Sequence, residues 1–212
     1  MEIFDFPQNS PEWHSIRAGL VTASCFSQIL AKGQGKTRAA YLRRLAAEII
    51  TGEPMENFTT PAMERGHALE GEARNLYAFM HDVEPVQVGF IRNGRKGCSP
   101  DSLLDETALL EIKTQRGDLL IETMLKDEFP KCHEAQVQGQ LWVAEREWCD
   151  LLVYAPGFPP FIKRQHRNEK FISELSAAVA AFNAELDDLV ERIRSYGGME
   201  APVSDLKAAA GA

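Results

Sequence analysis

Short apolar segments of strand type occupy the middle of the chain, and segments of helix type stand on both sides of them. Val, Ile and Leu fill the runs 108–113 and 148–154, and a Pro-rich turn leads into a further strand pattern at 161–167. Residues 83–91 and 97–104 also have strand character. Helices are expected from Pro11 after the cap residue Ser10, from Thr22 or Ser24 to Leu30, and over 37–51, 61–80, 131–147 and 168–194. This order predicts an α/β (α+β) fold, with a central mixed β-sheet flanked by helices.

The composition is that of a chain with one hydrophobic core. With 212 residues, 44% of them hydrophobic, we expect a single domain over 1–198 and a weakly patterned, flexible tail over 199–212. Apolar runs are too short to cross a bilayer, and the first ten residues lack the pattern of a secretion signal. The four cysteines are scattered without a CxxC pair, which indicates reduced thiols in a cytoplasmic protein.

The charge is distributed unevenly along the chain. The net charge of −8 argues against a nucleic-acid partner, because phosphate binding is mainly electrostatic. However, residues 32–44 hold five basic side chains and no acid, and a second basic group follows at 163–170. Such clusters can give an acidic protein one positive face. Ordinary solvated helix faces remain the alternative interpretation.

A bend followed by a short strand carries the residues with the strongest chemical signal. Ser99-Pro100-Asp101 precedes Glu111-Ile112-Lys113 by ten residues. Alternate residues of a strand share a face, so Glu111 and Lys113 should project together, with Asp101 brought beside them by the bend. Two carboxylates and a backbone carbonyl are ligands suited to Mg²⁺, which supports phosphodiester hydrolysis. A surface ion pair on an edge strand is the alternative.

Five segments in order resemble the phage lambda exonuclease, or YqaJ-type viral recombinase, family of PD-(D/E)xK nucleases. They are Ser10–Gly19 with Thr22-Ala23-Ser24, Gly66–Glu70, Cys98–Asp101, Leu110–Lys113 and Ala135–Gln138. The resemblance covers positions 10 to about 155 and implies a restriction-endonuclease-like core. Residues 114–130 and the C-terminal third do not align with the family pattern.

The resemblance implies roles for individual residues. Asp101, Glu111 and the Ile112 carbonyl correspond to metal ligands, and Glu70 to an additional carboxylate that binds directly or through water. Lys113 corresponds to the residue that activates water, and Gln136 to a glutamine that supports it. The remaining assignments are a 5′-phosphate pocket (Arg17, Ser24, Ser99), an apolar residue that separates the strands (Met63) and a basic DNA channel (Lys32, Lys36, Arg38).

The activity that the resemblance implies is 5′-to-3′ digestion of linear double-stranded DNA, dependent on one or two Mg²⁺ ions, with Mn²⁺ as a substitute. Mononucleotides would be released, and the 3′ overhang would pass to a phage-type single-strand annealing protein. A ring-shaped homotrimer and a phage or prophage protein in the bacterial cytoplasm are also implied. Two alternatives stay open: another PD-(D/E)xK enzyme, such as an endonuclease or a RecB-like nuclease, and a non-catalytic module that binds DNA ends.

Overall fold

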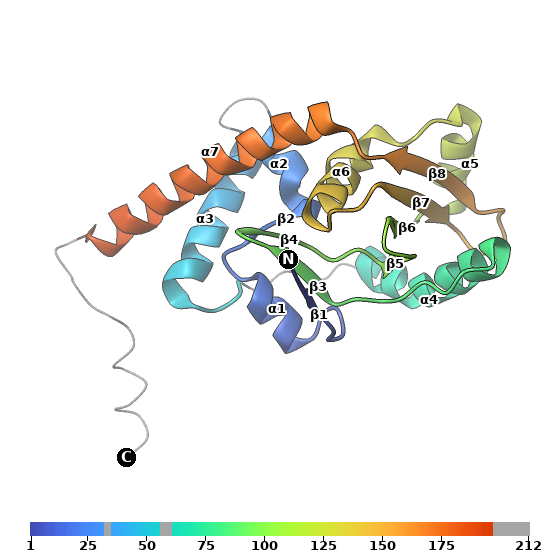
Figure 1. The fold of residues 1–212 in the computed structure, drawn as a ribbon, viewed down its shortest axis with the longest axis horizontal. Helices are drawn as coiled ribbons and strands as arrows, with labels where there is room; N and C mark the ends of the chain where they lie inside the picture. The colour runs from blue at the N-terminus through green and yellow to red at the C-terminus, as the bar shows by residue number, and fades with distance from the viewer. Residues whose placement is uncertain (32–34, 56–60, 197–212) are drawn as a thin grey trace, which may run out of the picture.

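The structure is a computed structural model that describes residues 1–31, 35–55 and 61–196, with the side chains of 61–63 also left out. Two four-stranded mixed sheets and seven α-helices make up this part of the chain (Figure 1). The predicted α+β class is therefore confirmed, with the expected central sheet divided into two. Among the helices of the described ranges, none is long and apolar enough to span a membrane.

The first sheet has the strand order β1-β3-β4-β2. Strands β1 (Glu2–Phe4), β3 (Phe90–Asn93) and β4 (Lys96–Cys98) are antiparallel neighbours, and β2 (Val21–Thr22) lies parallel to β4. Sequence patterns did not predict β1 or β2, because strands of two or three residues are too short to show a period.

The second sheet has the order β5-β6-β7-β8 and contains the predicted acid–lysine strand. Strand β6 (Ala108–Thr114) is central, parallel to β7 (Trp148–Tyr154) and antiparallel to β5 (Ser102–Leu103). The edge strand β8 (Phe161–His166) pairs with β7. The three residues 99–101 join the two sheets, because β4 ends at Cys98 and β5 begins at Ser102.

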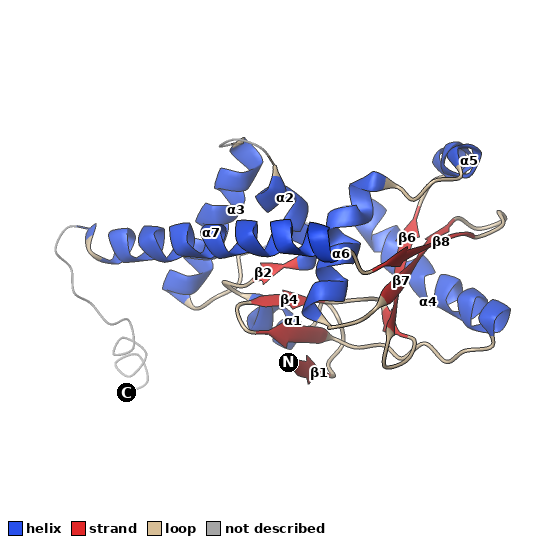
Figure 2. Ribbon diagram, turned by 45° about the horizontal axis from the view of Figure 1, so that its top comes forward, coloured by secondary structure: helices blue, strands red, loops and turns tan. Residues whose placement is uncertain are grey.

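The helices cover the two sheets on different sides (Figure 2). Helix α4 (Pro61–His81) packs on β6 and β7, where Ala73 and Tyr77 bury against Leu110 and Leu152. Helix α6 (Glu134–Val143), entered through the 3₁₀ turn η2 (Lys131–His133), packs on the first sheet and on η1 (Ala23–Cys25). The remaining helices are α1 (Pro11–Arg17), α2 (Phe26–Leu30), α3 (Lys36–Thr51), α5 (Gly117–Lys126) and α7 (Glu169–Arg194).

The main core lies where α7 crosses α2, α3 and α6, as Figure 1 shows. Phe182 and Leu186 of α7 are fully buried there, together with Phe26 of α2. Gly139 of α6 permits this contact, because a Cβ at position 139 would lie only 2.3 Å from a carbon of the Phe26 ring. Close packing at this point fixes the depth of α6.

Several predicted boundaries are confirmed by local capping. The Ser10 side chain accepts from the Trp13 amide, and the Asn168 side chain accepts from the Phe171 amide, as expected of helix N-caps. Gly52 ends α3 in the left-handed conformation with φ of 72°. The strand over 148–154 is confirmed to the residue.

Other predictions differ from the structure. Residues 83–91 are not a continuous strand, since only Val86 bridges to Leu103 before β3 begins at Phe90. The helix expected over 131–147 is a 3₁₀ turn followed by α6, which ends at Val143. Residues 117–126, which matched no family pattern, form α5. The predicted tail lies outside the described residues.

Candidate active site

Glu111 lies at the centre of a buried polar cluster on β6. Its carboxylate is 2% exposed, and its two oxygens accept from different groups. Oε1 accepts from Lys113 Nζ at 2.6 Å and from Gln136 Nε2, and Oε2 accepts from Gln140 Nε2 at 2.6 Å. Leu110 and Ile112 pack in the cluster under α4. The predicted alternation along this strand is therefore confirmed, and the surface-pair alternative is wrong because Glu111 is buried.

Asp101 stands beside this cluster at the junction of the two sheets. Its Oδ2 accepts from the Ile112 backbone amide at 2.5 Å, so the bend does bring the aspartate to β6. Burial, followed by the neighbouring charges of Glu111 and Glu70, raises the pKa of Asp101 well above its usual range, while Lys113 opposes the shift. Burial therefore disfavours the ionised form of Asp101, and the nearby carboxylates of Glu111 and Glu70 add to that effect.

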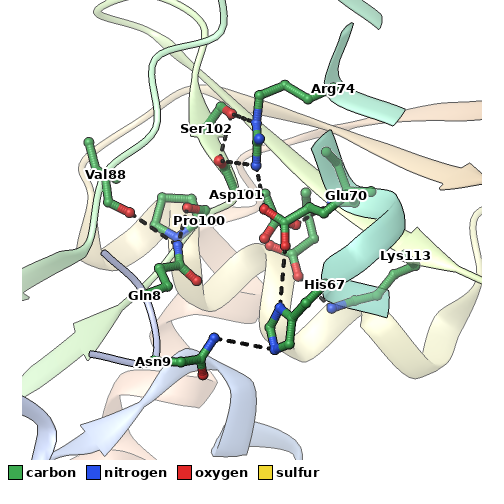
Figure 3. A network of polar contacts seen from close by, with 12 residues as sticks. Gln8, Asn9, His67, Glu70, Arg74, Val88, Pro100, Asp101, Ser102 and Lys113 are labelled. Carbon is green, nitrogen blue, oxygen red and sulfur yellow. Dashed lines mark hydrogen bonds and ion pairs between the residues drawn. The ribbon is translucent and has the colours of Figure 1, made fainter. Parts of the chain in front are cut away.

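Glu70 projects from α4 towards the same region, and Arg74 holds it there. Arg74 forms an ion pair with Glu70 one helical turn away, and donates to Ser102 Oγ at 2.9 Å and to the Asp101 carbonyl at 3.4 Å. Figure 3 shows this guanidinium between α4 and the 101–102 segment. Arg74 therefore fixes the distance between Glu70 and the Asp101 bend.

The Lys113 amine is held in its protonated form by this arrangement. Burial lowers the pKa of its amine, but the nearby carboxylates of Glu111, Asp101 and Glu70 outweigh burial, and the pKa is raised overall. An amine with a raised pKa stays protonated at neutral pH. In the metal-free protein the protonated amine can orient a water molecule or neutralise charge.

The oxygen donors of this region are few. Within the described ranges, no three or more His, Cys, Asp or Glu side chains are grouped so that they could hold a metal ion. Mg²⁺ does not require such a group, because it keeps several waters and binds through one or two carboxylates. Asp101 and Glu111 with the Ile112 carbonyl supply hard oxygen donors of this kind, and burial beside other carboxylates raises the pKa of Asp101, an effect that a bound cation would oppose. These residues are chemically suited to a hydrated divalent cation.

A cavity of about 650 Å³ lies next to the carboxylate cluster and contains Arg17 and Ser24 in its wall. The Arg17 guanidinium stacks on the Trp13 ring at 3.6 Å from the centroid and donates to Ser99 Oγ at 3.4 Å. Burial lowers the pKa of Arg17 to about 10. Among the described residues no carboxylate forms an ion pair with Arg17, although a buried guanidinium is stabilised by an anion.

The three predicted phosphate-pocket residues are only partly brought together. Ser99 lies at Arg17, where its hydroxyl also accepts from Trp13 Nε1 at 2.9 Å. Ser24 is exposed on η1 and its hydroxyl lies 3.3 Å from that of Thr22, on the wall of the same cavity. Ser99 is not part of that wall, so its hydroxyl contacts Arg17 on the side away from the cavity and orients the guanidinium.

A second cavity, of about 570 Å³, is lined by Glu70 and Arg74 and adjoins the first. Asn9 and His67 line both cavities. Asn9 Nδ2 lies 3.3 Å from His67 Nε2, and His67 Nδ1 lies 3.6 Å from Glu70, as drawn in Figure 3. This pair thus stands between the Arg17 cavity and the carboxylate cluster.

The predicted DNA-channel residues are less well defined. Lys36 is exposed at the start of α3. Arg38 forms a bidentate ion pair with Glu185 of α7 at 2.7 and 2.8 Å, so it also ties two helices together. Lys32 and the side chain of Met63 lie outside the described residues.

Sequence reasoning did not identify Gln140, Arg74 or Trp13 as parts of the site. Gln140 follows Gln136 by four residues, and Arg74 follows Glu70 by four, so both lie on the helix face of a predicted residue. That spacing was a usable signal. The indole of Trp13 meets Ser99 across 86 positions, and no local pattern indicates such a contact.

The fold and the buried acid–lysine pair define a mixed α+β protein with the fold of the alkaline exonucleases. The chain belongs to the YqaJ-like viral recombinase domain family, whose pattern matches residues 12–147. This membership implies a nuclease that acts on DNA.

Solved structures with the same fold include an alkaline exonuclease, LHK-Exo, from Laribacter hongkongensis. It is 30% identical, and the match covers 96% of this chain and 100% of that chain at a TM-score of 0.80. LHK-Exo has also been solved in complex with dAMP, with a TM-score of 0.81 and the same identity and coverage. A phage-related exonuclease from Haemophilus somnus 129PT shares the fold at 14% identity, with 82% and 96% of the two chains covered and a TM-score of 0.64. No curated protein matches the chain.

Proposed function

We propose that this protein is a magnesium-dependent exonuclease that digests linear double-stranded DNA from its 5′ ends. It releases mononucleotides and leaves a 3′ overhang. The observation that carries this proposal is the segment 99–101, which joins the two sheets and serves both regions. Ser99 accepts from the Arg17 guanidinium, which has no carboxylate partner in the described part of the chain, and Asp101, two residues later, lies beside the carboxylate of Glu111.

The two cavities support a path for the DNA strand. A terminal 5′-phosphate held by Arg17 places the nucleotide that carries it at Asn9 and His67, which border both cavities. The next phosphodiester then lies near Glu70 and Asp101. A terminal anchor beside the reacting bond positions that bond by proximity, which is a large part of many enzymatic rate accelerations.

The chain's own residues divide the work at the scissile bond. Asp101, Glu111 and the Ile112 carbonyl would hold Mg²⁺, with Glu70 as a direct or water-mediated ligand. The ion, when bound, activates water and stabilises charge on the phosphoryl oxygens. The Lys113 ammonium orients the attacking water and neutralises developing charge, and Gln136 holds the Glu111 oxygen that Lys113 shares. One or two ions, with Mn²⁺ as a substitute, suit this site.

Further parts of the proposal concern the assembly and its setting. A homotrimeric ring would surround the duplex, with Lys36 and Arg38 towards the channel and Met63 at the point of strand separation. The overhang would be passed to a phage-type single-strand annealing protein in the cytoplasm of a bacterial host. The support for these features is the family membership of residues 12–147.

The test is digestion of end-labelled linear duplex with and without Mg²⁺, alongside closed circular duplex. The proposal expects 5′-labelled mononucleotides from linear DNA only when Mg²⁺ is present, and intact circles. Cutting of circles would instead favour an endonuclease. Digestion from the 3′ end would refute the polarity and the phosphate-pocket assignment, but not the metal site.

A further inference from the structure

Gln140 is a buried amide in which only the nitrogen, of its two polar atoms, has a hydrogen-bond partner among the described residues. It lies on α6 at 1% exposure, and its Nε2 donates to Glu111 Oε2 at 2.6 Å. Its Oε1 is buried, and no partner for this oxygen is found among the described residues. An unsatisfied buried acceptor costs free energy, and an apolar side chain of similar size would avoid that cost. The donor bond to Glu111 is therefore what distinguishes glutamine at this position.

The two oxygens of Glu111 face different surroundings. Oε1 is shared by Lys113, whose side chain is 29% exposed, and by the half-buried Gln136. Oε2 meets Gln140 in the interior of the protein. Lys113 and Gln136 reach Oε1 from the more open side, where a ligand can also approach this oxygen. Gln140 is enclosed by packing and keeps hold of Oε2.

We propose that Gln140 is a positioning residue that restricts Glu111 to binding a divalent cation through one oxygen. This inference rests on the metal site of the proposed function. Mg²⁺ requires near-ideal octahedral geometry, whereas Ca²⁺ accepts carboxylates that bind through both oxygens and tolerates more ligands. By occupying Oε2, Gln140 favours the smaller ion. It thus gives the site selectivity for Mg²⁺ over Ca²⁺.

The test compares Gln140→Met with Gln138→Met in the full chain. Gln138 is a matched control because it lies on the same helix at 1% exposure, but it bonds the His166 carbonyl and the Asn168 amide instead of Glu111. Mg²⁺ and Ca²⁺ affinities are measured without DNA by titration calorimetry, and thermal unfolding is followed in parallel.

Gln140→Met is expected to weaken Mg²⁺ binding by about 10- to 100-fold, the usual effect of losing a residue that orients a metal ligand. Ca²⁺ affinity should fall less, so the Mg²⁺/Ca²⁺ ratio drops. Gln138→Met should lower the melting temperature and leave that ratio unchanged. Gln140→Leu provides a second apolar variant with the same expected change of ratio.

An unchanged Mg²⁺/Ca²⁺ ratio in both Gln140 variants would overturn the inference, as would an equal change in Gln138→Met. A wild-type chain that binds neither ion would overturn it together with the proposed metal site. Digestion with 3′-to-5′ polarity would refute the proposed direction alone, and an altered ratio in the Gln140 variants would still support the role of Gln140.

Discussion

The carboxylate cluster around Glu111 and the cavity around Arg17 show opposite kinds of charge imbalance. In the first, burial and neighbouring carboxylates raise the pKa of Asp101, so the folded chain resists its ionisation. In the second, burial lowers the pKa of Arg17 to about 10, so the folded chain resists its protonation. A cation would relieve the first imbalance and an anion the second.

The two regions depend on the same short connection, residues 99–101, in different ways. Ser99 orients the guanidinium through its hydroxyl, and Asp101 contributes a carboxylate that is held by the Ile112 amide. Under the proposed function, a DNA end with its cation would supply both the cation and the anion. The substrate complex would then remove two electrostatic costs that the free protein carries.

The largest expected effect separates activity from stability. Asp101→Asn keeps an oxygen for the Ile112 amide but removes the crowded charge, so DNA digestion should fall about 1000-fold or more, in line with the several kcal/mol that a catalytic metal supplies. The metal-free variant should melt about 2–4 °C higher, which corresponds to about 1 kcal/mol in a chain of this size. Digestion rates and calorimetric melting curves check both. A variant that loses activity and also melts lower would contradict the charge-crowding argument.

A second prediction concerns the Arg17 cavity, where an anion is expected to bind. Arg17→Ala should slow digestion of 5′-phosphorylated duplex by about 10- to 100-fold, the value of a charge-assisted hydrogen bond, and leave 5′-hydroxyl duplex almost unaffected. Arg17→Lys should restore little, because an ammonium cannot donate the paired bonds of a guanidinium.

The matched control for Arg17 is Arg95→Ala, which removes an exposed guanidinium paired with Asp187 on α7. It should leave the ratio of rates on the two DNA ends unchanged. If Arg95→Ala abolishes the phosphate preference as well, net charge, and not the Arg17 cavity, governs the choice of end.

The smallest effect is a pH dependence of stability. Because the folded pKa of Asp101 is raised above the unfolded value of about 3.9, the folded state binds more protons than the unfolded chain between the two values. Stability of the metal-free protein should therefore fall as pH rises through that window, by at most about 1.4 kcal/mol per pH unit for one group. Melting curves should show this slope, and Asp101→Asn should remove it.

Lys113 has the same sign of pH dependence, but at alkaline pH. Its raised pKa means that its contribution to stability is complete below the unfolded lysine pKa of about 10.4 and is lost as pH rises through the folded pKa.

Added Mg²⁺ should stabilise the protein more strongly as Asp101 ionises, since the ion competes with the proton. Equal stabilisation by Mg²⁺ on both sides of the Asp101 transition would argue against Asp101 as a ligand.

Much of the fold was predictable because its longer elements carry local signals. The Asn168 and Ser10 caps, Gly52 and the apolar run of β7 each mark a boundary within a few residues of sequence. The division into two sheets was not predictable, since it depends on the pairing of β1 and β2 with distant strands. The helix α5 was missed because its residues matched no family pattern.

The site was predictable to a similar degree. Period-two alternation placed Glu111 and Lys113 on one face, and the bend placed Asp101 near them. The division of the Glu111 oxygens between Lys113 and Gln140 depends on the tertiary packing that brings the α6 side chains to β6, which no sequence period encodes. The stacking of Arg17 on Trp13 likewise arises from the tertiary packing.

Because Gly139 has no side chain, a substitution at this position could be misinterpreted in an activity assay. The ring of Phe26 occupies the space that a methyl group at 139 would need. Any larger residue there would lift α6 away from its neighbours and withdraw the amides of Gln136 and Gln140 from Glu111 together. A substitution among purely apolar neighbours would then look, in a nuclease assay, like the loss of a catalytic residue.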